Sequence, residues 1–278
     1  MPQQVEKSVL ITGCSSGIGL SVAIGLKQRG YQVITSARKQ ADVERLIASG
    51  FHSVQLDLDD SDSIQQAVAE ALSITSGKLY GLFNNGAYGQ PGAVEDLSRQ
   101  TLRAQFETNL FGWHELTCKI IPIMRQQSEG RIIQNSSVLG FAALAYRGAY
   151  NASKFALEGL TDTMRAELKG SGIQVSLIEP GPIESRFRAN AYAMWKQNIS
   201  PMGSFHRDAY QAMEERLTKA GPAVPFTLPP EAVLKRVIHA LESPRPKIRY
   251  YVTFPTYLFG TLKRILPYRA MDWILSRV

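Results

Sequence analysis

The chain has 278 residues, 44% of them apolar, and carries a formal net charge of +7. This length lies within the single-domain range of α/β folds and the apolar fraction supplies a full core, so no second domain is required. Two cysteines, Cys14 and Cys118, are too few for a disulfide framework or a zinc site, and we expect both to be reduced and structural, with no metal bound.

No run of about 18 uninterrupted apolar residues occurs, and residues 1–7 contain no apolar stretch that would indicate a signal peptide. We therefore expect a cytoplasmic protein. The positive charge alone is compatible with nucleic-acid binding, but no recognition motif accompanies it, so we expect no nucleic-acid partner.

Strand and helix patterns alternate along the chain. Apolar runs predict strands at 9–11, 32–36, 53–56, 81–83, 131–134 and 174–178, and helical periodicity predicts helices at about 17–29, 40–49, 61–74, 99–126 and 150–170. Such alternation is typical of an α/β fold with one Rossmann-like, doubly wound parallel sheet and helices on both faces. Ligands then bind at the carboxyl ends of the strands.

A glycine-rich loop joins the first predicted strand to the first predicted helix. Its sequence is Thr12-Gly13-Cys14-Ser15-Ser16-Gly17-Ile18-Gly19. Glycines at these positions permit a tight turn, a close approach to phosphate oxygens and close helix packing, with the helix N-terminus facing the anion. The loop predicts a dinucleotide site formed by Gly13, Ser15, Ser16, Gly17, Ile18 and Gly19, although by itself it fits an ordinary turn equally well.

Tyr150 and Lys154 are four residues apart in a predicted helix and therefore share one face. An ammonium group there stabilises a phenolate, so Lys154 is expected to lower the pKa of Tyr150 and make it a proton donor and acceptor. Ser137 follows the strand at 131–134. Each residue alone has an ordinary structural explanation, but together, behind the glycine loop, they indicate an active site.

These motifs occur in the order of one known family, together with Asp57-Leu58-Asp59, Asn84-Asn85-Gly86-Ala87, Asn109, and Pro180-Gly181 with Ser185. Over residues 8 to about 190 the chain resembles a classical short-chain dehydrogenase/reductase. It is similar to the branch that contains 17β-hydroxysteroid dehydrogenases, retinol dehydrogenases and bacterial NADP-dependent aldehyde reductases. The resemblance implies an oxidoreductase that transfers a hydride between a nicotinamide and a carbonyl or alcohol.

The resemblance also implies roles for individual residues. Tyr150 is the general acid or base, Ser137 holds the substrate oxygen, Lys154 also binds the nicotinamide ribose, and Asn109 binds a water that links Lys154 to solvent. Asp57 resembles the residue that hydrogen-bonds the adenine, and a turn cap is its alternative. The remaining implied cofactor contacts are Leu58, Asn84, Asn85, Gly86, Pro180, Gly181, Ile183 and Ser185.

The segment Asn84-Asn85-Gly86-Ala87 exchanges the last two residues of the family's usual order. Because glycine takes backbone conformations closed to alanine, we expect this loop to run differently around the cofactor. Plain turn residues are the alternative for Asn84 and Asn85.

Arg38 and Lys39 follow the second predicted strand, where an NAD enzyme would place a carboxylate. A guanidinium suits a 2′-phosphate, so we expect NADP(H) in preference to NAD(H). Ser16 lacks the second basic group that some NADP-preferring members carry, and a solvated Arg38 is the alternative.

We expect one domain over 1–278, with a cofactor-binding and catalytic core at 8–185, a substrate lid at 186–230 and a C-terminal extension at 231–278. Apolar lid residues favour a hydrophobic carbonyl or alcohol, with core packing as their alternative; they are Phe187, Tyr192, Met194, Trp195, Phe205 and Phe226. By resemblance the substrate is an aliphatic or retinoid-like aldehyde, with a steroid ketone second.

Two other function classes fit the same fold. A non-catalytic NADP-binding regulatory protein need not keep Ser137, Tyr150 and Lys154 together. An epimerase of the related extended group has a different glycine spacing from the Gly-x-x-x-Gly-x-Gly found here.

From Lys235 onward the chain carries nine basic residues against two acidic ones, interleaved with apolar residues. This pattern predicts an amphipathic segment that covers the core or contacts another subunit, with peripheral contact to an anionic membrane as the alternative. The family resemblance implies a homodimer or homotetramer packed through the helices around 101–126 and 150–169.

Overall fold

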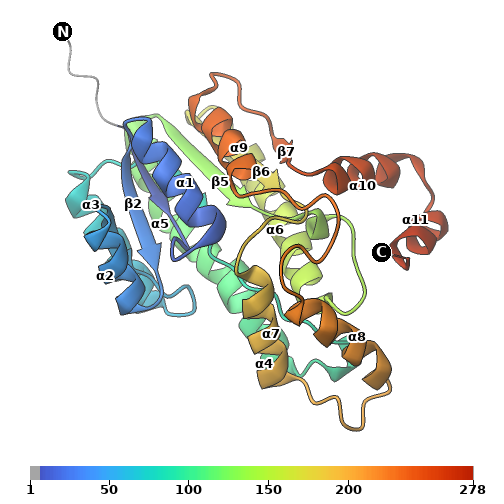
Figure 1. Ribbon diagram of the computed structural model, residues 1–278. Helices are drawn as coiled ribbons and strands as arrows, with labels where there is room; N and C mark the ends of the chain where they lie inside the picture. Colours follow the sequence, from blue (N-terminus) through green and yellow to red (C-terminus); the bar gives the residue numbers. More distant parts are fainter. Residues whose placement is uncertain (1–6, 278) are drawn as a thin grey trace.

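The computed structural model of the protein describes residues 7–277 and contains a seven-stranded sheet in the order β3-β2-β1-β4-β5-β6-β7 (Figure 1). Residues 1–6, where the sequence predicts no signal peptide, lie outside the described residues. All neighbouring strands are parallel. The strands are β1 Ser8–Ile11, β2 Gln32–Ala37, β3 His52–Gln55, β4 Gly81–Asn84, β5 Gly130–Asn135, β6 Ile173–Glu179 and β7 Arg249–Tyr251.

The predicted doubly wound fold is confirmed by the way the central strand is buried. In β1, Leu10 packs into the core on one face of the sheet, whereas Val9 and Ile11 pack into the core on the other. Because successive side chains of a strand point to opposite faces, a strand covered on both sides must be continuously apolar. Strand order reverses between β1 and β4, and doubly wound sheets bind their ligands at such a switch point, at the carboxyl ends of the strands.

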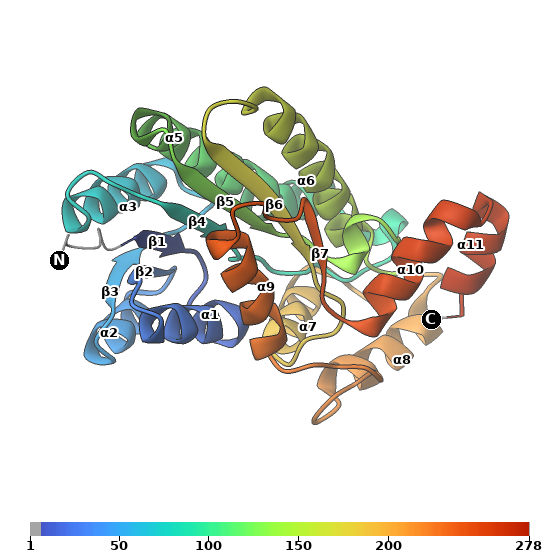
Figure 2. The ribbon, with the colours of Figure 1, turned by 90° about the horizontal axis from the view of Figure 1, so that it is seen from above.

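Helices cover both faces of the sheet (Figure 2). One face packs against α1 Gly17–Gln28, α2 Gln40–Ala48 and α9 Glu231–Glu242. The other packs against α3 Ser61–Ile74, α5 Gly112–Gln127 and α6 Gly148–Glu167.

The single helix predicted at 99–126 is interrupted. It consists of α4 Arg99–Phe106, a π-helical turn η2 Glu107–Phe111, and α5. Within the turn, the buried side chain of Asn109 bonds both the N–H and the carbonyl of Tyr88 in a neighbouring loop. This tertiary contact accompanies the widened turn, and periodicity alone does not reveal it. Such π-turns occur frequently at functional sites.

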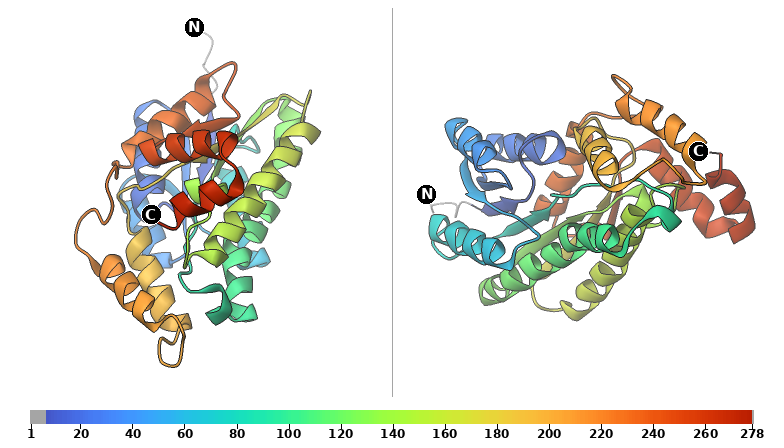
Figure 3. Two further views of the ribbon diagram at one scale, coloured as in Figure 1. Left: turned by 90° about the vertical axis from the view of Figure 1, so that its right-hand side faces the viewer. Right: turned by 90° about the horizontal axis from the view of Figure 1, so that it is seen from below.

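The predicted lid contains α7 Phe187–Asn198 and α8 Arg207–Thr218, which share a small core of their own. Beyond α9, the three-residue strand β7 was not predicted because it is too short to show an alternation. The chain ends in α10 Phe254–Ile265 and α11 Tyr268–Leu275, which extend from one side of the molecule (Figure 3). Two short 3-10 turns, η1 Val94–Asp96 and η3 Val138–Gly140, complete the fold.

Two further expectations are tested by the described residues. No helix within 7–277 has the length and apolarity needed to cross a membrane. Both cysteines are free, as expected, but only Cys14 is buried, whereas Cys118 is exposed on α5 beside His114. Cys118 therefore does not pack in the core as a structural residue.

Candidate active site

The glycine loop closes against the carboxyl end of β4. Gly13 has a φ of +71°, which favours glycine, and a Cβ at Gly19 would lie 2.3 Å from the carbonyl oxygen of Gly13. The loop therefore leaves no room for side chains where the chain turns into the N-terminus of α1. This cradle of backbone at a helix N-terminus fits a dinucleotide pyrophosphate.

Asn85 holds this loop from the side. Its Nδ2 donates to the carbonyl of Thr12 at 3.0 Å, and its Oδ1 accepts from Asn135 Nδ2 at 2.9 Å. Asn84 is fully buried and donates to Thr117 at 2.9 Å and to Gln134 at 3.0 Å. The side chains of Asn84 and Asn85 thus bond groups of the protein and support the backbone that forms the site.

Gly86 lies where two loops approach closely, and a Cβ there would be 3.3 Å from the Gly13 nitrogen and from Thr12 Oγ1, which a small shift could accommodate. A Cβ at Gly13 would lie 2.6 Å from the Cα of Gly86, while Gly86 itself is not among the described glycines with positive φ. The exchange of glycine and alanine in this motif therefore places the small residue where two loops touch. Our expected reason, a backbone conformation closed to alanine, was wrong.

Ser137, Tyr150 and Lys154 come together at the carboxyl end of β5. Ser137 caps η3, and its hydroxyl lies close enough to Tyr150, in the first turn of α6, to lower the pKa of the phenol. Lys154 is almost fully buried, and its Nζ lies 5.7 Å from the centre of the Tyr150 ring and donates to the Asn135 carbonyl at 2.9 Å. The predicted acid, oxygen clamp and cation therefore form one cluster.

The pKa of Tyr150 differs from the expectation. Burial raises it to about 12, and the Ser137 hydroxyl and the Arg147 charge oppose this rise only in part. Burial also lowers the pKa of Lys154 to about 7. In the ligand-free protein Lys154 loses its proton before Tyr150 does, so it does not lower the phenol's pKa as predicted.

Arg147 is a functional candidate that sequence reasoning missed. It precedes Tyr150 by three residues at the N-terminus of α6, and its charge lowers the pKa of Tyr150. Burial and the like charge of Arg216 in α8 lower the pKa of Arg147 itself to about 10. Only the spacing to Tyr150 signals this role in the sequence, because the contribution of α8 depends on the folded lid.

Asn109, predicted to hold a relay water, is fully buried in the π-turn beside the catalytic helix. Its Nδ2 donates to Ser153 at 3.3 Å, the residue directly before Lys154. The structure thus brings Asn109 next to the catalytic helix, and its described side-chain bonds are to Tyr88 and Ser153.

At the adenosine end, Arg38 is exposed immediately after β2. A second basic residue, Arg45 of α2, donates to the glycine-loop carbonyl of Ser15 at 2.7 Å and to Asp42 at 2.8 Å. Sequence reasoning missed Arg45 because nothing in a helix pattern shows that its side chain returns to the loop.

Asp57 and Leu58 follow β3 on the same side of the site. Asp57 Oδ1 accepts from the N–H of Asp59 at 3.2 Å, so this residue does shape a turn, as its alternative explanation proposed. Leu58 is buried and packs closely against Gly112 at the start of α5.

The segment after β6 reaches back to the glycine loop. A Cβ at Gly17 would lie 3.0 Å from the Cβ of Ser185, so these two predicted cofactor residues are neighbours. Gly181 lies against Thr253, Ile183 forms an isolated bridge with Leu228, and the Pro180 carbonyl accepts from Val138 at 2.8 Å.

The lid residues divide into two groups. Phe187 stands edge-on to Tyr150, with ring centres 5.3 Å apart, and so lies against the phenol that we predict to be catalytic. Of the others, Trp195 and Tyr192 pack in or against the small core of α7 and α8, Phe205 is exposed to solvent, and Phe226 packs against Phe254 with the rings tilted. For Trp195 and Tyr192 the core-packing alternative holds.

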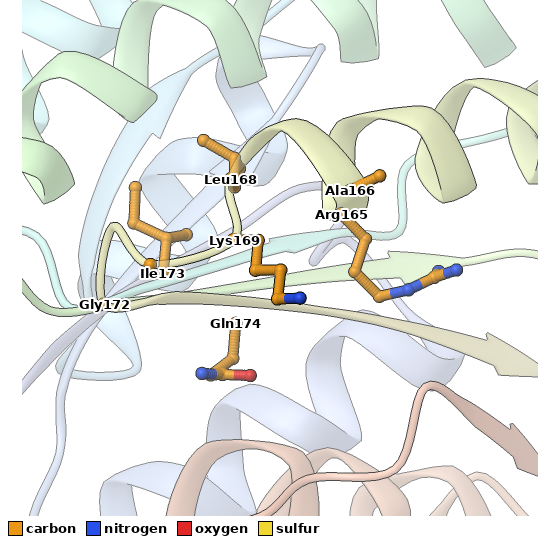
Figure 4. Close-up of a pocket in the computed structure, with 8 residues that line it drawn as sticks. Arg165, Ala166, Leu168, Lys169, Gly172, Ile173 and Gln174 are labelled. Atoms are coloured by element: carbon orange, nitrogen blue, oxygen red, sulfur yellow. The ribbon is translucent and has the colours of Figure 1, made fainter.

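Two open hollows lie away from Tyr150. One, of about 420 Å³, adjoins the far end of α6 around Arg165, Lys169 and Gln174 (Figure 4). The other, of about 510 Å³, lies between η2, α5 and α6 and is lined by Leu110, Phe111, His114, Ala156, Gly159, Leu160 and Thr163. Neither contains a predicted catalytic residue.

Comparison with known proteins agrees with this geometry. The family described as "short chain dehydrogenase" matches residues 7–195. An uncharacterized oxidoreductase, YbbO of Escherichia coli, is 45% identical and covers 98% of this chain and 95% of its own. Human retinol dehydrogenase 8 is 31% identical over 93% of this chain and 85% of its own.

Two further proteins extend the comparison. An NADPH-dependent 3-dehydrocapnine reductase of Ornithobacterium rhinotracheale is 31% identical over 96% of this chain and 95% of its own. The crystal structure of a short-chain dehydrogenase from Streptomyces avermitilis superposes with a TM-score of 0.76 at 25% identity, covering 97% of this chain and 95% of that one. The chain therefore belongs to the short-chain dehydrogenase family of oxidoreductases.

Proposed function

We propose that this protein uses NADPH to reduce hydrophobic aldehydes and NADP⁺ to oxidise the corresponding alcohols. The observation that carries the proposal is the cluster of Ser137, Tyr150 and Lys154 beside a glycine cradle that fits a dinucleotide. When bound, the nicotinamide supplies or accepts the hydride at the carbonyl carbon.

The chain's own residues then manage the charge on the substrate oxygen. Tyr150 donates its proton to that oxygen in reduction and takes it back in oxidation. Ser137 donates a hydrogen bond to the same oxygen as its charge develops. Lys154 in its ammonium form stabilises the phenolate that remains. Phe187, edge-on to Tyr150, keeps water away from the phenol.

Cofactor preference is proposed from the adenosine end of the site. Arg38 directly follows β2 where no carboxylate stands, and the Arg45 guanidinium bonds the glycine loop at Ser15 as well as Asp42. Guanidinium groups bind phosphate through paired, charge-assisted hydrogen bonds. NADP(H) is thus preferred over NAD(H), in line with the NADPH-dependent relative.

The substrate class is proposed from the apolar closure by Phe187 and from the retinol dehydrogenase among the relatives. Aliphatic or retinoid-like aldehydes come first and steroid ketones second. A non-catalytic NADP-binding regulatory protein would not need the Tyr150 cluster. The test is NADPH oxidation measured across aliphatic aldehydes, retinal and steroid ketones, with NADH in parallel. We expect turnover of an aldehyde with NADPH; no turnover of any carbonyl, or a preference for NADH, contradicts the proposal.

A homo-oligomer is proposed from the apolar hollow between η2, α5 and α6, beside which Phe111 and Phe155 are partly exposed. A second copy that lays the same helices against this face would cover them. A Cβ at Gly159 would meet no atom within 4 Å, so Gly159→Arg fits the folded monomer and blocks the contact. In sedimentation velocity, this variant should be monomeric while Ile47→Arg, on the distant α2, keeps the wild-type assembly.

We place the protein in the cytoplasm, with peripheral membrane contact through α10 and α11 as a secondary proposal. Phe259 and Met271 pack these helices onto Ala142, while Ile265, Tyr268 and Trp273 face solvent near basic residues. Deletion of residues 256–278 tests the contact. If co-sedimentation with anionic phosphatidylserine vesicles is the same after the deletion, the membrane proposal is wrong.

A further inference from the structure

A buried pair of carboxyl groups lies behind the catalytic cluster and has no place in the mechanism above. Glu179, the last residue of β6, is fully buried, and Glu158 of α6 is 9% exposed. Both meet Arg249 of β7, at 3.1 Å from its Nε to Glu179 and 3.2 Å from its Nη2 to Glu158. The strands and the helix that carry these residues pass beside one another (Figure 2).

The two carboxyl groups approach each other closely, because each lies within 3.2 Å of the same guanidinium. Glu158 Oε1 and both Glu179 oxygens nevertheless receive no hydrogen bond of good geometry from any described residue. Two ionised carboxylates are acceptors only and repel one another, so such a contact forms when the pair holds a proton. Accordingly, burial and the neighbouring carboxylate raise the pKa of Glu179 to about 9.

Charge balance in the cluster also favours one shared proton. Arg249 is a single cation, and it bonds Asp162 at 2.6 Å in addition to the pair. With both glutamates ionised, three carboxylates would surround one guanidinium. With one proton shared, the pair carries a single negative charge, and the buried part of the cluster is close to neutral.

Glu158 is one helical turn beyond Lys154, so the two side chains lie on the same face of α6. Lys154 is 1% exposed, and burial lowers its pKa to about 7. The Glu158 charge opposes this fall, and the Asn135 carbonyl at 2.9 Å and the Trp113 ring at 4.1 Å also contact the ammonium group. Without the Glu158 charge the pKa of Lys154 would fall further, and a larger share of Lys154 would be the neutral amine, which cannot stabilise a Tyr150 phenolate.

We propose that Glu158 is a positioning residue that favours the ammonium form of Lys154, and that Glu179 permits this by sharing one proton with Glu158. The catalytic cation is thus held by a buried countercharge on its own helix. The kinetic part of this inference rests on the proposed function; the ionisation of Lys154 does not.

Other charged groups face the pair. The Glu158 charge attracts that of Lys263 of α10, and both carboxylates contribute to the raised pKa of Tyr251 of β7. Gly140 in η3 closes the remaining side, because a Cβ there would lie 3.0 Å from Glu158 Oε1. The nearest charged neighbour that offers a matched control is Asp162, one turn further along α6, which also bonds Arg249 but is more exposed.

The test compares Glu158→Gln with Asp162→Asn. Glu158→Gln removes the countercharge of Lys154, which for side chains one helical turn apart in a partly polar interior is worth about one to two pH units. We expect the pKa of the Lys154 ammonium, followed by NMR of ¹³Cε-labelled lysine, to fall by that amount. The pH above which alcohol oxidation declines should fall equally. Asp162→Asn should leave both values unchanged.

Glu179→Gln resembles the protonated partner and should also keep both values close to wild type. If Glu158→Gln and Asp162→Asn lower the melting temperature alike and neither changes the Lys154 pKa, Glu158 has only a structural role and the inference is overturned. If Glu158→Gln does not fold, the same titration is made with Glu158→Asp. The shorter side chain moves the carboxylate away from Lys154, so the Lys154 pKa should fall by a smaller amount. An unchanged Lys154 pKa overturns the inference. The NMR titration needs no substrate, so it stands even if aldehyde turnover is never found.

Discussion

Lys154 Nζ donates a 2.9 Å hydrogen bond to the backbone oxygen of Asn135. The side chain of Asn135 in turn donates to Asn85, which holds the carbonyls of Thr12 and Gly13. One chain of polar contacts therefore joins the catalytic helix to the glycine loop. The end of β5 therefore contacts both Lys154 and the loop that we propose binds the cofactor.

The glycine loop gives the first prediction. Gly13→Ala should destabilise the fold by more than the roughly 1 kcal/mol expected for a positive φ alone, and should weaken NADPH binding. The reason is that its Cβ would lie 2.6 Å from the Cα of Gly86. Gly30→Ala is the matched control, because Gly30 has a φ of +83° but no atom within 4 Å. Equal losses in chemical denaturation would show that the loop contact is unimportant.

Arg38→Ala tests cofactor preference. Loss of charge-assisted hydrogen bonds to a 2′-phosphate costs about 1.5–3 kcal/mol, so kcat/KM with NADPH should fall about 10- to 100-fold. The value with NADH should change little, since NADH lacks that phosphate. Steady-state kinetics with both cofactors provide the measurement, with Lys39→Ala as the neighbouring control. A parallel fall for both cofactors would mean that Arg38 does not read the phosphate.

Arg147→Gln should move the pH dependence of alcohol oxidation. Oxidation requires the deprotonated phenol of Tyr150, and the positive charge of Arg147 lowers the pKa of that phenol. Removing the charge raises this pKa, so the rising limb of kcat/KM should move to higher pH by about one unit. Arg29→Gln, at a surface ion pair with Glu242, should leave the limb in place. A limb that stays fixed or moves to lower pH in Arg147→Gln would exclude this role.

Glu179 predicts a pH dependence of stability. Its pKa is raised in the fold from 4.5 to about 9, so between these values the native protein holds a proton that the unfolded chain releases. The stability that this group provides is complete below about pH 4.5 and is lost as pH rises towards 9. Glutamine does not titrate. The melting temperature of Glu179→Gln should therefore rise relative to that of the wild type as the pH increases from 6 to 9. A constant difference would mean that Glu179 is ionised throughout.

The sequence predicts the fold well where the physics is local. The strand runs, the glycine loop and the four-residue spacing of Tyr150 and Lys154 are readable because each rests on short-range periodicity or on backbone space. What the sequence does not reveal depends on tertiary contact. The π-turn accompanies the bonds of Asn109 to Tyr88, and Arg45 reaches Ser15 across a loop.

The pKa values of the site do not follow from the sequence alone. Spacing places an ammonium near Tyr150, but burial outweighs it and raises the phenol's pKa, while the groups that oppose burial, Ser137 and Arg147, act through the folded site. The buried Glu158 and Glu179 look in the sequence like ordinary surface acids. Only the arrangement of β6, β7 and α6 shows that they face each other.

The central claim, that Tyr150 is the acid and base for hydride transfer, is tested most directly by Tyr150→Phe. Turnover of an aldehyde identified with the wild type, followed by NADPH oxidation, should fall by the roughly 10²–10⁴-fold that a positioned proton donor contributes. NADPH binding, followed by fluorescence titration, should stay close to wild type, because the glycine cradle is unchanged. Residual turnover above about one per cent of wild type, with binding intact, would contradict the assignment.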